Sequence, residues 1–143
     1  MRSILVILLA SLITPLALGQ SPEEHRERIQ QEKVAFFNRE LELTKAEAKA
    51  FWPLYNDYQN RKNRIIAEKR TLMGYYTKNE KHISDEEVTD ILNRYIEFEK
   101  QETQLLNTYT VKFREILPDE KVLKIYLAEI KFKNYLLNQL RTD

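Results

Sequence analysis

The stretch that decides the fold is FWPLYNDY, residues 51–58, in which Pro53 stands inside a run of aromatic residues. At about 100° per residue, the apolar residues on both sides of Pro53 fall within an arc of roughly 120°, the width of a core-facing helical stripe. Proline removes one helical hydrogen bond and crowds the preceding turn, so it bends a helix that keeps its inward face. We therefore predict one bent helix over 45–76, with a stripe formed by Phe51, Leu54, Tyr55, Tyr58, Ile65, Ile66, Leu72, Met73 and Tyr76.

The aromatic run has a second interpretation, a binding pocket lined by Trp52, Tyr55 and Tyr58. Aromatic residues at helical spacing are more often core, because their large rings bury much apolar surface. We favour the core interpretation and keep the pocket as the alternative.

Three segments begin with a capping box, in which a hydroxyl residue and a glutamate three positions later satisfy each other's free backbone N–H groups. The pairs are Ser21 with Glu24, Thr44 with Glu47, and Ser84 with Glu87. Pro118 marks a fourth start, because proline and the acids that follow it suit a first helical turn. The predicted helices cover residues 22–41, 45–76, 85–116 and 118–140.

The second and third helices are predicted to form a long antiparallel hairpin, since the connection TKNEKHIS is short. Residues 58–81 hold seven basic and two acidic residues, whereas residues 84–102 hold seven acidic and two basic residues. This complementarity predicts that Lys62 faces Glu99 or Glu102 across the hairpin.

Two charged clusters have both a functional and a structural interpretation. The basic cluster consists of Arg61, Lys62, Arg64, Lys69 and Arg70. It could bind a polyanion, but we favour the interpretation that it pairs with the facing acidic helix. The acidic cluster consists of Asp85, Glu86, Glu87 and Asp90. It could hold a divalent metal ion, but acids in the first turn of a helix are expected from the helix dipole alone.

The fourth helix carries two apolar stripes on nearly opposite faces. One contains Leu123, Tyr126, Leu127, Ile130, Leu137 and Leu140, and the other contains Ile125, Phe132 and Leu136. A helix that is apolar on two faces must be covered twice or present one face to a partner. We assign the second stripe to an intermolecular surface.

The N-terminal segment, the charge balance and the residue composition narrow the classes of function that the chain can have. Residues 1–19 have the basic start and short apolar core of an export signal with cleavage before Gln20, which leaves residues 20–143 as one domain outside the cytoplasm. Without Arg2 the chain has 22 basic and 22 acidic residues, which argues against a nucleic-acid binder. No cysteine is present, and the dispersed serines and histidines form no catalytic set, so we expect neither an enzyme nor a cofactor.

The segments Leu43-Thr-Lys-Ala-Glu47 and Leu117-Pro-Asp-Glu-Lys121 resemble the twice-repeated Leu-Thr-x-x-Gln motif of the bacterial periplasmic Spy/CpxP-like family. The resemblance spans most of the predicted mature chain, which looks like a divergent branch of the family. It implies a bent, cradle-shaped all-α protein that forms an antiparallel homodimer and acts as an ATP-independent chaperone or as a sensor of envelope stress or heavy metals. Glu47 stands in place of the first glutamine of the motif, and Pro118 with Lys121 replaces the second threonine and glutamine. Metal sensing is disfavoured, because the predicted mature chain has no cysteine, two dispersed histidines and one methionine, Met73.

The sequence therefore predicts a periplasmic holdase or envelope-stress modulator that binds exposed segments of partly folded proteins. The expected client or dimer surface combines the second stripe of the fourth helix with Trp52, Tyr55, Tyr58, Arg61 and Lys62, the two basic residues steering acidic clients. A dedicated adaptor that docks on a membrane-bound kinase or anti-sigma regulator is the alternative, and a purely structural coiled-coil spacer is a third.

Overall fold

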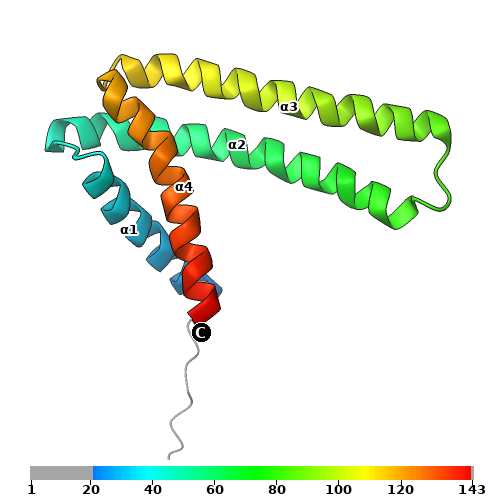
Figure 1. The fold of residues 1–143 in the computed structure, drawn as a ribbon, viewed down its shortest axis with the longest axis horizontal. Helices are drawn as coiled ribbons and strands as arrows, with labels where there is room; N and C mark the ends of the chain where they lie inside the picture. The colour runs from blue at the N-terminus through cyan, green and yellow to red at the C-terminus, as the bar shows by residue number, and fades with distance from the viewer. Residues whose placement is uncertain (1–20, 143) are drawn as a thin grey trace, which may run out of the picture.

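A computed structural model describes residues 21–142, which form four helices with no strand among them (Figure 1). Helix α1 spans Pro22–Glu40, α2 spans Lys45–Asn79, α3 spans Asp85–Arg114 and α4 spans Asp119–Thr142. The predicted all-α fold and its four helices are thereby confirmed. The predicted signal peptide and its cleavage site before Gln20 lie outside the described residues.

The helix starts follow the predicted capping chemistry. In all three capping boxes the hydroxyl accepts from a backbone N–H while the glutamate accepts from the N-cap N–H. Pro118 lies one residue before α4 rather than inside it, and its carbonyl accepts from the Val122 N–H at 3.1 Å. Helix α2 continues to Asn79, beyond the predicted end at 76, so the turn that joins it to α3 is shorter than expected.

Helix α2 passes through Pro53 without interruption, and the aromatic run around it is core. Phe51, Tyr55 and Tyr58 are buried, and the Phe51 ring lies 5.8 Å from that of Phe113 on α3. Trp52 is half-buried. The structure therefore favours the core interpretation over the pocket: with Tyr55 and Tyr58 buried among other aromatic rings, little of the run can contact a ligand.

The four helices form two arms that meet at an angle (Figure 1). Helices α2 and α3 pack along each other as the predicted antiparallel hairpin, while α1 and α4 pair and project away from the base of that hairpin. The main core lies at this junction and includes residues of all four helices. A smaller cluster of Leu72, Ile91 and Phe98 holds the outer half of the hairpin together.

The predicted pairing of Lys62 with Glu99 or Glu102 across the hairpin is wrong. Lys69, rather than Lys62, lies opposite the acids of α3: its ammonium is 2.7 Å from the Glu99 carboxylate and also contacts Glu102. These two hydrogen bonds raise the pKa of Lys69. The prediction ended α2 at 76, three residues before its observed end at Asn79, which accounts for part of this displacement.

Candidate functional site

An uncovered apolar stripe runs along α4. Leu123 is 70% exposed and Ile130 is 60% exposed, values typical of surface rather than core. We call the exposed apolar residues of this helix the α4 stripe: Leu123, Leu127, Ile130, Leu137 and Leu140. At about 100° per residue, the first four share one side of the helix, and Leu140 lies beside them near the end of the helix.

The assignment of Ile125, Phe132 and Leu136 to an intermolecular surface is wrong. Ile125 is fully buried and Phe132 is 5% exposed within the single chain, and Leu136 packs against the same core. The cover is α1, whose Phe36 ring lies 5.4 Å from the Phe132 ring. The sequence argument overlooked that a short first helix can cover one face of α4, and it therefore exchanged the covered and uncovered stripes.

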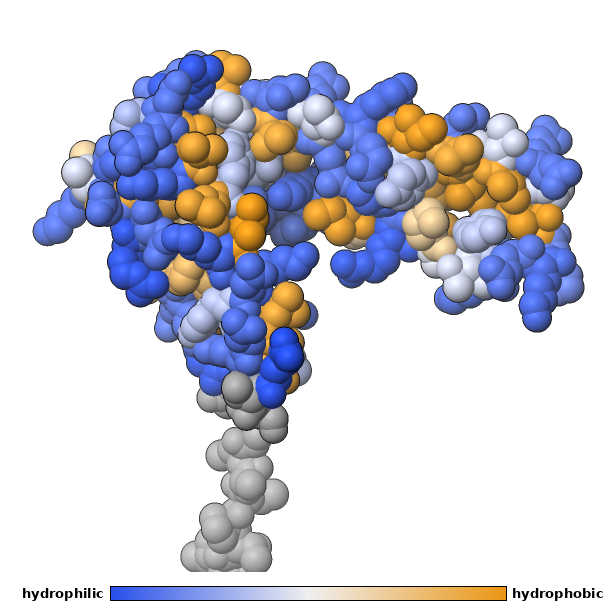
Figure 2. Space-filling view, viewed as in Figure 1, coloured by the Kyte–Doolittle hydropathy of each residue, from blue (hydrophilic) through white to orange (hydrophobic). Residues whose placement is uncertain are grey.

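A second apolar surface lies toward the tip of the hairpin. Side chains of α2 and α3 line a groove of about 310 Å³ that contains no charged residue: Met73, Tyr76, Val88, Ile91, Leu92 and Tyr95. Met73 is 39% exposed although the sequence analysis placed it in the core-facing stripe of α2, and Leu92 of α3 is 56% exposed. A two-helix hairpin cannot cover all sides of a wide stripe, so the outer residues of this stripe remain at the surface. Figure 2 shows hydrophobic groups along α4 and over the outer half of the hairpin.

The other predicted surface residues divide between core and surface. Tyr55 and Tyr58 are buried in the core and cannot contact a partner there. Lys62 is only 30% exposed, and its ammonium lies 3.4 Å from the Glu129 carboxylate rather than free at the surface. Arg61 is well exposed, and its guanidinium is held by Asp57 at 3.2 Å.

A polar cluster missed by the sequence analysis joins α4 to α2. The Glu129 carboxylate accepts hydrogen bonds from the Tyr55 hydroxyl at 3.2 Å, from Lys62 and from the Gln59 amide. Burial and the Glu129 charge raise the pKa of Tyr55, so the phenol remains a donor. Burial lowers the pKa of Lys33 on α1, an effect that the Glu129 charge opposes. The cluster fixes the junction between the two arms.

Segments 43–47 and 117–121 meet in space through Glu47 and Lys121. Glu47 and Lys121 form an ion pair of 2.7 Å, and the same ammonium donates to the Glu42 carbonyl at 2.7 Å. The hydrogen bond from Lys121, followed by that from the Thr44 backbone, lowers the pKa of Glu47. Glu47 and Lys121 are therefore a matched charge pair that joins the start of α2 to α4.

Within residues 21–142, no group of three or more histidine, cysteine or acidic side chains is arranged to hold a metal ion. In the acidic cluster at the start of α3, Glu87 caps the helix and Asp90 lies 4.0 Å from Arg94. None of the described helices is both long and apolar enough to cross a membrane.

Comparison with family models, curated proteins and solved structures finds no match for this chain. The functional argument therefore rests on the two apolar surfaces, the α4 stripe and the hairpin groove.

Proposed function

We propose that the protein is an ATP-independent holdase or envelope-stress modulator of the periplasm, which binds exposed apolar segments of partly folded proteins. The observation that supports this most is the α4 stripe, where Leu123 and Leu140 are 70% and 75% exposed on a helix whose other face is core. The resemblance of the two motif segments to the Spy/CpxP-like pattern supports the same function. The export signal predicted from residues 1–19 supports the location.

The binding mechanism is burial of apolar surface at several weak sites. Each Å² of apolar area removed from water contributes about 25 cal/mol, so a single leucine contact contributes little and several together hold a client reversibly. The α4 stripe and the hairpin groove lie on different arms, which lets one extended client contact both. No nucleotide is required, because burial itself drives binding and dilution reverses it.

The purified chain without its first nineteen residues should suppress aggregation of several unrelated proteins in the absence of ATP. Light scattering of chemically unfolded clients during dilution measures this, with an equal mass of a folded helical protein as the control. Protection of at least three unrelated clients is the expected result. A dedicated adaptor for one membrane-bound regulator would protect none, and a structural spacer would behave in the same way, so absence of protection would refute the holdase.

A homodimer belongs to the same proposal, with the second copy covering the α4 stripe. Clients and the second copy then compete for one surface, because the same leucines serve both. Sedimentation equilibrium should show a dimer whose fraction rises with concentration, and the double variant Leu127→Lys/Ile130→Lys should sediment as a monomer. The change Val111→Lys, at another exposed apolar position, is the control. A monomer at every concentration, or a dimer unaffected by the double variant, would contradict this arrangement.

A further inference from the structure

The hairpin carries a separate groove whose charged lining residues are all basic. It has a volume of about 450 Å³, and Arg61 and Arg64 of α2 face Lys112 of α3 across it. Because Arg64 is two residues beyond Lys62, it lies about 200° away around α2, on the opposite side from the Glu129 contact. The groove is therefore distinct from the surfaces on the α4 side of the hairpin.

Two of the cationic groups are placed by contacts with Asp57, which lies outside the lining of the groove, and with Tyr109, which is part of it. Asp57 accepts from the Tyr109 hydroxyl and from Arg61, and the Tyr109 hydrogen bond, followed by the Arg61 hydrogen bond, lowers the pKa of Asp57. The Lys112 ammonium lies 4.7 Å from the centre of the Tyr109 ring. Among the described residues Arg64 has no ion-pair partner. Two cations are thus held in position, while a third is available to an incoming anion.

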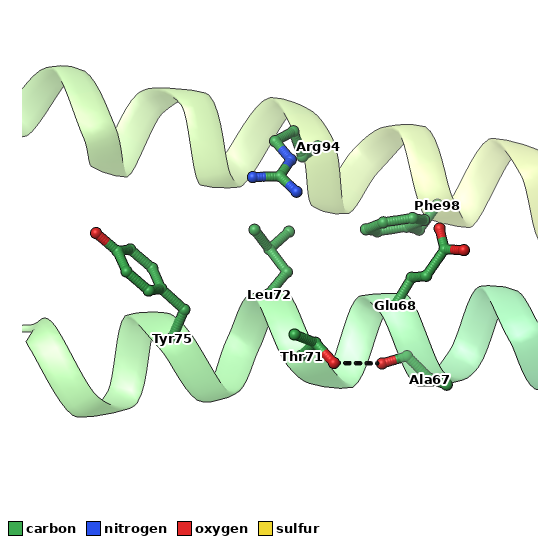
Figure 3. A pocket seen from close by; sticks show the side chains of 7 residues that line it. All are labelled: Ala67, Glu68, Thr71, Leu72, Tyr75, Arg94 and Phe98. Atoms are coloured by element: carbon green, nitrogen blue, oxygen red, sulfur yellow. Dashed lines mark hydrogen bonds between the residues drawn. The ribbon is translucent and has the colours of Figure 1, made fainter.

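The groove continues toward the hairpin tip as a second hollow of about 440 Å³ (Figure 3). Figure 3 shows Leu72 and Phe98 between the two helices, with Glu68 beside them. The two hollows adjoin, since Ile65 and Glu68 are one helical turn apart on α2. Together they form a channel that is basic at the base of the hairpin, while the outer hollow combines Leu72, Tyr75 and Phe98 with one acidic and one basic residue, Glu68 and Arg94.

We infer that this channel binds an extended segment of another polypeptide, with carboxylates over Arg61, Arg64 and Lys112 and a large apolar side chain over Leu72 and Phe98. From Arg61 to Tyr75 the channel is about 21 Å long at 1.5 Å per residue, which an extended chain of about six residues spans. A phosphate polymer could use the basic half only. The outer hollow holds one residue of each charge, Glu68 and Arg94, whereas the inner hollow holds three cations, so the carboxylates of the ligand are drawn to the basic end.

The probe is a fluorescent peptide of about eight residues with three glutamates at one end and a phenylalanine at the other, followed by anisotropy. Binding should weaken about tenfold with Arg64→Glu and by less than about twofold with Arg70→Glu, an exposed arginine of α2 outside the channel. Replacing the peptide's phenylalanine with serine should also weaken binding several-fold. Salt should weaken it further.

Three results would overturn the inference. The first is no binding at about 1 mM peptide. The second is equal loss with Arg64→Glu and Arg70→Glu, which would show general attraction to a basic surface. The third is inorganic polyphosphate competing fully while the serine peptide binds as well as the phenylalanine peptide, which would show a simple anion site. The outcome is independent of client protection, since the channel and the α4 stripe are separate surfaces.

Discussion

Phe132→Ala should lower the free energy of unfolding by about 3 to 5 kcal/mol, the usual cost of truncating a buried phenylalanine. Phe132 is 5% exposed and packs against the rings of Phe36, Phe37 and Tyr135. Removing its ring leaves a cavity between α1 and α4. Urea unfolding followed by circular dichroism measures the change.

The matched control is Leu123→Ala on the opposite face of α4. Leu123 is 70% exposed in the single chain, so at concentrations where the chain is monomeric its removal should change the free energy of unfolding by less than about 0.5 kcal/mol. The original expectation that Phe132 faces a partner predicts the reverse, with little loss of monomer stability. Equal effects of the two substitutions would contradict the placement of the core.

Glu129→Ala should be the second most damaging change, at about 2 to 3 kcal/mol. The substitution leaves the Tyr55 hydroxyl, the Gln59 amide and the Lys62 ammonium without their shared acceptor, and an unsatisfied buried polar group costs about 1 to 3 kcal/mol. Solvent limits the loss, because the Lys62 side chain is 30% exposed. The measurement is again urea unfolding, together with small-angle scattering of the native chain.

Two variants separate the role of Glu129 from general effects of charge. Glu129→Gln keeps one acceptor oxygen and should cost less than Glu129→Ala. Glu97→Ala removes an acid that is 57% exposed and lies 3.8 Å from Lys100, and it should cost almost nothing. Scattering of Glu129→Ala should also show a wider spread of angles between the arms. An unchanged angle distribution together with a stability loss no larger than that of Glu97→Ala would contradict the role of Glu129.

The helices could be predicted because their signals are local. A capping box involves residues three positions apart, and the aromatic stripe around Pro53 keeps one phase over several turns, so both are readable without tertiary contacts. The antiparallel hairpin followed from the short connection. Its register did not follow, because it depends on the last turn of α2, where the sequence has no glycine or proline to mark the end.

The face of α4 that is covered could not be predicted, because both stripes are apolar and the covering helix is distant in sequence. The sequence did contain one signal of which face is covered. Glu129 lies between Ile125 and Phe132 on the covered side, and an acid inside an apolar stripe indicates a polar partner on another helix. The pairing of Glu47 with Lys121 was hidden for a similar reason, since each residue looked like an isolated departure from the motif.

Aggregation suppression by the double variant Leu127→Lys/Ile130→Lys tests the central claim most directly. Both residues lie on the α4 stripe and are exposed, at 47% and 60%, so the variant should fold with wild-type helical content and, at concentrations where the wild type is monomeric, with the wild-type unfolding midpoint. The proposed function predicts that it loses most of its protection of unrelated unfolded clients, while Val111→Lys, changed at a residue 58% exposed on α3, protects as the wild type does. Full protection by a folded double variant would contradict the claim that the α4 stripe is the client-binding surface.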